Sequence, residues 1–215
     1  MKHRIILCLA FVLCGLPGGD SDAAIVFPKA PDGGRQIVYE NVGQILQAHP
    51  RTLGGLRIED LTIPDPHREY FVGLTNLASG HLLSAAKSDG WRYLLVHGTN
   101  AVGVATVFDA DPKTGKALRF GALYETCFAK ETLEALRKAE KLPQIKKQDY
   151  ELRFLDIPSV YFVAVWLHRE SDDILIPLPS TFGRWDAYQP YSESAMIKLL
   201  KPEAKKVLKA PMLIR

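Results

Sequence analysis

Residues 91–108 read WRYLLVHGTNAVGVATVF, and this stretch decides the class of fold. It holds two runs that are rich in β-branched and aromatic residues, Trp91–His97 and Ala101–Phe108, a composition typical of strands. Only three residues separate the two runs. Parallel strands need a crossover of a dozen or more residues, so a link this short joins antiparallel strands. The stretch therefore predicts two antiparallel neighbours in a β-sheet.

More strand-like runs follow on the C-terminal side. Ala117–Glu125 comes after residues 109–115, a loop that contains Asp, Pro and Gly in their usual turn roles. Gln148–Ile157 alternates apolar and polar residues, and Val160–His168 is apolar on both faces, which predicts a central strand. Ile174–Leu178 is the last run. The links between most of these runs are again short, which favours antiparallel pairing.

Helical periodicity marks three segments around the strands. The apolar residues of Glu69–Lys87 form one broad stripe, which predicts a single helix. Lys130–Lys141 predicts a second helix, and a third is expected to begin after Ser192 as its N-cap, with an interruption at Pro202. Together the elements predict an α+β fold, a mainly antiparallel β-sheet of about six strands with helices packed on it.

Composition divides the chain into three parts. Residues 1–23 form a candidate secretory signal peptide, residues 24–66 an irregular N-terminal arm rich in Pro and Gly, and residues 67–215 a single α+β domain. The arm contains one predicted short helix and a short edge strand, Gly55–Ile63. The apolar face of that helix consists of Val38, Val42, Ile45 and Leu46.

The first part has the order of features found in cleavable signals. A basic head at residues 2–4 precedes an apolar run, Ile5–Leu16, that is too short to span a membrane. Small residues then predict cleavage after Ala23 or the next residue. A lipid anchor is the alternative, although Leu13 before Cys14 does not suit lipoprotein processing. We expect a secreted or periplasmic protein with no transmembrane segment after signal removal.

Charge and cysteine content restrict the function further. The formal net charge of +3 is too small to predict nucleic-acid binding, which needs a concentrated basic face. Signal cleavage removes Cys8 and Cys14, so the mature chain keeps only Cys127 and forms no internal disulfide. Its stability is therefore expected to come from packing.

Metal and cofactor motifs are incomplete in this chain. Residues 109–120 begin like a calcium loop, but Lys113, Thr114 and Phe120 stand where other residues are required. Gly115-Lys116 lacks the leading Gly and the following Ser or Thr of a phosphate-binding loop. The histidines of the mature chain are not paired at ligand spacing within one element. We predict no metal site and no cofactor.

The catalytic candidates are Cys127, His97 and His168. Cys127 lies between a predicted strand and a predicted helix, and a helix N-terminus can activate a thiol. His97 and His168 each end a strand and are candidate bases for such a thiol. The competing interpretation, which we favour, is that Cys127 fills the core beside Phe128 and that the histidines are structural.

The aromatic loop, Pro177–Tyr191, is the preferred candidate for ligand binding. Amphipathic rings stand there beside charged residues, a mixture that suits a protein, peptide or carbohydrate ligand. The candidate ligand-binding residues are Phe182, Arg184, Trp185 and Tyr188. Alternatively, the loop is a hydrophobic flap that covers the sheet edge with its rings inside.

The sequence thus predicts a non-catalytic binding or interaction domain. One alternative is a hydrolase or transferase that uses Cys127 with a strand-end histidine, and another is a structural, envelope-associated protein. The lysines of the last predicted helix also allow a weak contact with an anionic membrane surface, although a solvated helix face explains them equally well.

Overall fold

The computed structural model describes residues 24–109, 118–125, 127–181 and 185–210. The predicted signal peptide, residues 1–23, lies outside this part of the chain. The strands are β1 (Ile25–Val26), β2 (His67–Phe71), β3 (Lys87–His97), β4 (Asn100–Phe108), β5 (Arg119–Tyr124), β6 (Tyr150–Ile157), β7 (Phe162–His168), β8 (Ile174–Pro177) and β9 (Tyr191–Ser192). The helices are α1 (Gly34–Ala48), α2 (Leu74–Ser79), α3 (Cys127–Ala139) and α4 (Glu193–Lys209).

All the described strands belong to one sheet, in the order β5-β4-β3-β2-β6-β7-β8-β9, with β1 also paired to β6. β1 and β2 pair with β6 in parallel, and the other described pairs are antiparallel. The predicted α+β class with a mainly antiparallel sheet is confirmed. The estimate of about six strands was too low, because β1 and β9 have only two residues each and β2 was interpreted as helix.

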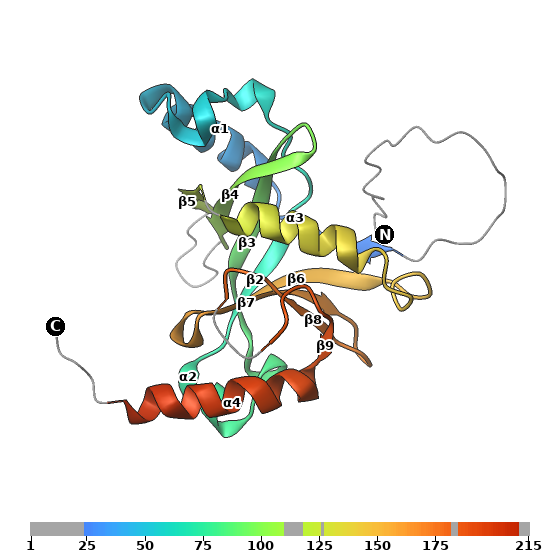
Figure 1. Ribbon diagram of the computed structural model, residues 1–215. Helices are drawn as coiled ribbons and strands as arrows, with labels where there is room; N and C mark the ends of the chain where they lie inside the picture. Colours follow the sequence, from blue (N-terminus) through green and yellow to red (C-terminus); the bar gives the residue numbers. More distant parts are fainter. Residues whose placement is uncertain (1–23, 110–117, 126, 182–184, 211–215) are drawn as a thin grey trace, which may run out of the picture.

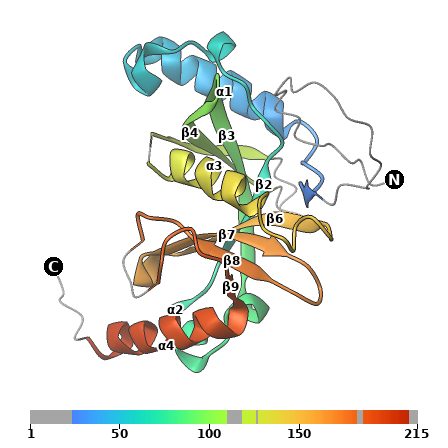
Figure 2. The same cartoon turned by 45° about the vertical axis from the view of Figure 1, so that its right-hand side comes forward.

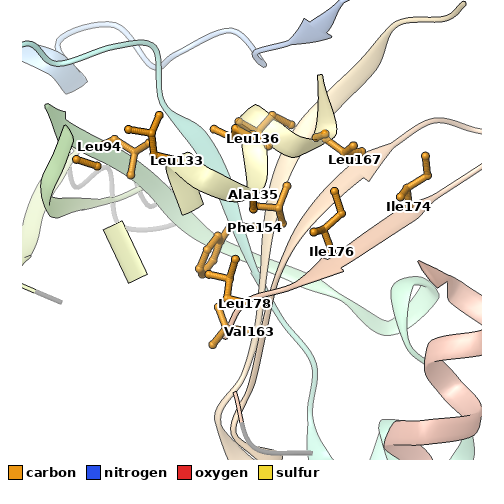
Figure 3. Packing of buried hydrophobic residues seen from close by; sticks show 14 of the residues in the cluster. Leu94, Leu133, Ala135, Leu136, Phe154, Val163, Leu167, Ile174, Ile176 and Leu178 are labelled. Carbon is orange, nitrogen blue, oxygen red and sulfur yellow. The ribbon is translucent and has the colours of Figure 1, made fainter. Parts of the chain in front are cut away.

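Helices cover the two faces of the sheet unequally. α3 packs on one face, where Leu133 and Leu136 join a buried cluster with Phe154 of β6 and residues of β7 and β8 (Figure 3). The other face carries two separate clusters, one under α1 and one under α2 and α4. Figures 1 and 2 show α1 and α4 at opposite ends of the molecule with α3 between them. The middle of the second face therefore lies between two helical covers.

The N-terminal arm contributes to the same sheet. Its predicted helix is confirmed as α1, which ends with His49 as its C-cap. Val38, Val42 and Leu46 are buried in a cluster with Tyr93 of β3. β1 adds a short strand beside β6. The boundary between arm and domain at residue 66 stays a prediction. Side chains of the arm nevertheless fill part of the hydrophobic core.

The predicted helix over Glu69–Lys87 is wrong. The segment begins within β2, continues through the six-residue α2 and a 3₁₀ turn at Leu83–Ala85, and enters β3. Its two glycines are not inside a helix: Gly73 is the N-cap of α2, and Gly80 is the C-cap with a φ of 97°. A left-handed C-cap glycine ends a helix, so the apolar stripe belongs to several short elements that face one cluster.

The predicted edge strand Gly55–Ile63 is also wrong. Ile58–Asp60 forms a 3₁₀ turn, and Thr62 makes an isolated bridge with Val96. The Asp60 side chain accepts a hydrogen bond from the backbone N–H of Arg57 at 2.9 Å, which closes the turn. This local bond competes with an extended conformation.

Pro202 does not interrupt the last helix, contrary to expectation. α4 runs continuously from Glu193 to Lys209 with Pro202 inside it. A proline in a helix interior removes one backbone hydrogen bond and costs roughly 3 kcal/mol. Leu200 and Ala204 on either side of it are buried against the α2 region and the sheet, and this burial offsets the cost.

Candidate functional site

The centre of the sheet contains an unusually polar strand. β2 reads His67-Arg68-Glu69-Tyr70-Phe71 and is paired on both edges, with β3 and with β6. Strands covered on both faces are normally rich in Val, Ile and Leu. The polar residues of β2 alternate between the two faces, so they create one polar site on each side of the sheet.

On the face away from α3, β2 forms part of a row of large side chains. Trp91 is opposite Arg68, Arg68 is opposite Arg153, and Arg153 is opposite Trp166 in the strand register. Directly opposite residues share one face of a sheet. The row crosses the middle of the face, between the clusters under α1 and under α4. We call Arg68, Tyr70 and Arg153 the arginine strip.

Arg68 is held by stacking and by hydrogen bonds. Its guanidinium carbon lies 4.4 Å from the centroid of the Trp91 ring. Its Nη1 donates to Asp109 Oδ2 and to Ser88 Oγ, both at 2.9 Å. Trp91 Nε1 donates to the second oxygen of Asp109 at 2.7 Å. One carboxylate thus positions both the arginine and the ring under it.

Arg153 is held in the same manner by two aromatic rings. Its guanidinium carbon lies 5.1 Å from the Tyr70 ring centroid and 4.8 Å from that of Trp166. The two rings meet edge to face at 5.1 Å. Arg153 Nε donates to Glu151 Oε1 at 2.7 Å. Stacking on rings and a carboxylate fixes the plane of this guanidinium.

His168, a sequence-predicted candidate, lies at the end of this row. Its Nδ1 is 2.8 Å from Asp173 Oδ1, which also accepts a hydrogen bond from Trp166 Nε1 at 2.7 Å. Because a carboxylate accepts, this contact favours the tautomer with the proton on Nδ1 and leaves Nε2 as the open ring nitrogen. Glu151 stands opposite His168 in the register.

The arginine strip is reachable from solvent. The side chains of Arg68 and Arg153 are 32% and 17% exposed, and those of Asp109 and Glu151 are 40% and 36% exposed. The rings of Trp91 and Trp166 are buried beneath them. The surface therefore offers guanidinium and carboxylate edges over an aromatic base.

The face covered by α3 carries the other polar residues. Arg92 is opposite His67, and its Nη1 donates to Glu69 Oε1 at 2.8 Å. The Arg92 guanidinium carbon lies 3.7 Å from the Phe154 ring centroid, and the His67 ring lies 5.8 Å from it. Asp156, two residues after Phe154, is the fourth polar member. We call the buried His67, Glu69 and Arg92, together with the half-buried Asp156, the buried quartet.

Burial changes the protonation of two members of the buried quartet. Loss of solvation, together with the positive charge of Arg92, lowers the pKa of His67 to about 3, so the ring is neutral. Loss of solvation and the nearby Glu69 raise the pKa of Asp156 to about 6, against the effect of Arg92. His67 Nε2 and Arg92 Nε have no hydrogen-bond partner among the described residues. Such shifted groups occur at functional sites and also in structural ion networks.

Cys127 does not fill the core, contrary to expectation, and no described contact joins it to either candidate base. It is exposed in the first turn of α3, with its Sγ 2.9 Å from Ser180 Oγ, and Ser180 bonds to Glu131. Ten residues along α3, about 15 Å, Arg137 donates to the carbonyl of Thr99 beside His97. His168 stays on the opposite face of the sheet. The described contacts therefore join Cys127 to neither histidine.

The aromatic loop is only partly described, because Phe182 and Arg184 lie outside the described residues. Trp185 is buried, donates from Nε1 to Thr181 Oγ1 at 2.6 Å, and meets the Phe162 ring edge to face at 5.1 Å. Tyr188 is half-buried, with Lys138 Nζ 4.2 Å from its ring centroid. These contacts are those expected if the loop is a hydrophobic flap. A ligand-binding role for Phe182, Arg184, Trp185 and Tyr188 stays a prediction.

Sequence reasoning missed the arginine strip and the buried quartet. The helical period of residues 69–87 predicted a helix where part of β2 lies. The pairing of Arg68 with Arg153 depends on the register of two strands that are far apart in sequence. One local signal was present, since Glu151 and Arg153 occupy the polar face of an alternating strand.

Comparison with known proteins adds no relative: no protein-family model, no curated protein and no solved structure matches this chain. None of the helices in the described ranges is both long and apolar enough to span a membrane. Among the same residues, no group of three or more His, Cys, Asp or Glu side chains is placed to hold a metal ion. The functional conclusion therefore rests on the chemistry of the site.

Proposed function

We propose that this chain is an exported, non-catalytic binding domain and that the arginine strip is its contact surface for a ligand. The observation that supports this proposal is the direct pairing of Arg68 with Arg153 at the partly exposed centre of the sheet. Like charges directly opposite each other in a sheet are destabilising. A sheet selected for stability alone has better residues for these two positions.

The carboxylates beside the strip fit the same proposal. Asp109 and Glu151 reduce the repulsion between the arginines and, with the tryptophans, hold both side chains in place. Binding surfaces gain affinity when their side chains are ordered before the ligand arrives, because less conformational entropy is lost. Trp and Arg are also enriched among residues that dominate binding.

Export is a separate part of the proposal and depends on the sequence of residues 1–23. The expected mature chain begins at Ala24 or at Ile25. Mass spectrometry of protein recovered from outside the cytoplasm tests this part. Recovery of the chain with an intact Met1 would count against it.

The contact surface is tested with charge-removing variants that keep side-chain length. Arg68→Gln and Arg153→Gln, alone and combined, are compared with Arg119→Gln, because Arg119 stacks on Phe108 at 4.2 Å in the edge strand β5, outside the strip. Thermal shifts are measured against a panel of oligosaccharides, peptides and small anions. We expect a ligand that stabilises the wild type and Arg119→Gln but not the double variant.

Unchanged binding by a folded double variant would contradict this assignment. If the double variant is folded by circular dichroism and binds every ligand as the wild type does, the arginine strip is not the contact surface. The Trp185 and Tyr188 region would then be the next surface to test.

A further inference from the structure

The arginine strip keeps hydrogen-bond donors that no described residue accepts from. In the bonds to described residues, Arg68 donates only from Nη1 and Arg153 only from Nε. A guanidinium has five N–H donors in one plane and no acceptor. The guanidinium carbons lie over the rings of Trp91, Tyr70 and Trp166. Both arginine side chains are partly exposed, so their remaining donors are available to a ligand.

The two tryptophan rings of the site, in contrast, leave no open face on which a ligand could stack. The arginines lie over the rings of Trp91 and Trp166, and both rings are almost completely buried. A sugar or a base that needs an open aromatic face therefore finds none at these two tryptophans. The chemistry left at the surface is that of donor edges.

We propose that the ligand of the arginine strip carries an oxyanion, a carboxylate or a phosphate group, and that Arg68 and Arg153 bind this group together. The inference rests on the proposed function, since it assigns a ligand class to the same surface. Guanidinium edges match the oxygen pairs of carboxylate and phosphate groups. Arg68 and Arg153 are register partners in paired parallel strands, so their side chains start from neighbouring positions on one face of the sheet.

Glu151 gives the proposal a characteristic signature. Its carboxylate already occupies Arg153 Nε at 2.7 Å, and it is 36% exposed. An incoming oxyanion competes with it for Arg153 and is repelled by its charge. Removing that charge with Glu151→Gln therefore strengthens oxyanion binding, whereas it has no such effect on a neutral ligand.

The test measures binding of inorganic phosphate, pyrophosphate and citrate by isothermal titration calorimetry at low and high ionic strength. We expect Arg68→Gln and Arg153→Gln to weaken binding about tenfold each, as for loss of a charge-assisted hydrogen bond. We expect Glu151→Gln to tighten binding about threefold and Arg119→Gln to leave it unchanged. Salt should weaken binding in every form, because the attraction is electrostatic. Tighter binding of the phosphates than of citrate assigns a phosphate ligand, and the reverse assigns a carboxylate.

Other outcomes overturn the inference in distinguishable ways. If none of the three anions binds but a neutral oligosaccharide or peptide does, with loss in the double arginine variant, the oxyanion assignment fails and the proposed function stands. If Arg153→Gln leaves anion binding unchanged, Arg153 is not an anion ligand. If no member of the panel binds in an Arg68- or Arg153-dependent manner, both proposals fail.

Discussion

At the scale of single residues, Asp156 and His67 link the fold to pH in opposite directions. The pKa of Asp156 is raised to about 6, so the folded state binds this proton at a higher pH than the unfolded state does. The free energy of unfolding that this group contributes is present below its unfolded pKa, about 3.9, and is lost as the pH rises through 6. The pKa of His67 is lowered to about 3, so its contribution is lost as the pH falls below about 6.5, its unfolded value. Between about pH 4 and pH 6 the two contributions to the free energy of unfolding therefore change in opposite directions: as the pH rises, that of Asp156 falls and that of His67 grows.

Two variants separate these contributions. We expect Asp156→Asn to gain stability relative to the wild type as the pH rises from about 4 to 8, by up to about 3 kcal/mol for two pKa units. We expect His67→Gln to gain relative to the wild type as the pH falls through the same range. Urea unfolding across pH measures both, and each variant is the control for the other. If the free energy of unfolding changes with pH in the same way in the wild type and in both variants, the pKa shifts of Asp156 and His67 are contradicted.

At the scale of elements, the start of α1 is fitted closely to the sheet. A Cβ on Gly34 would overlap the hydroxyl of Tyr93, a buried group without a hydrogen-bond partner among the described residues. Gly34→Ala should therefore cost about 1–3 kcal/mol of the free energy of unfolding, as overpacking does. Tyr93→Phe removes an unsatisfied hydroxyl and should cost little.

The double variant tests the contact itself. With Tyr93→Phe in place, Gly34→Ala should lose most of its cost, and a double-mutant cycle by urea unfolding gives the coupling energy. If the double variant is as unstable as Gly34→Ala alone, the loss comes from another contact, such as the neighbouring Pro31 side chain.

Elements also differ in how far their sequences specified them. β3, β4, β6 and β7 are long and carry strand periodicity, and α3 has one apolar stripe, so pattern was sufficient. β2 and α2 are short, and their apolar residues imitate a helical period. Their conformations are decided by pairing with β3 and β6 and by packing against α4.

At the scale of the whole molecule, the N-terminal arm is expected to be inseparable from the domain. Val38, Val42 and Leu46 cover Tyr93 and Leu95 in one cluster. Each buried apolar side chain of this size stabilises a fold by roughly 1.5–3 kcal/mol. Removing residues 24–66 would therefore expose more apolar surface than a marginally stable protein tolerates.

We expect a chain starting at residue 67 to lose cooperative thermal unfolding in circular dichroism. A chain starting at residue 24 lacks only the predicted signal and should unfold cooperatively. If the shorter chain is folded and equally stable, the arm is an appendage, as its Pro- and Gly-rich composition suggested.

The sequence by itself determined the α+β class, most of the long strands, α1 and α3, because local periodicity and turn residues specify which face of an element is apolar. Only the tertiary structure decided where β2 goes and which side chains meet across it. Arg68 and Arg153 are separated by most of the domain in sequence, and they become neighbours through a parallel register that no local pattern encodes. The burial of His67 and the partial burial of Asp156 follow from the same placement, since solvation depends on what covers a residue and not on its neighbours in the chain.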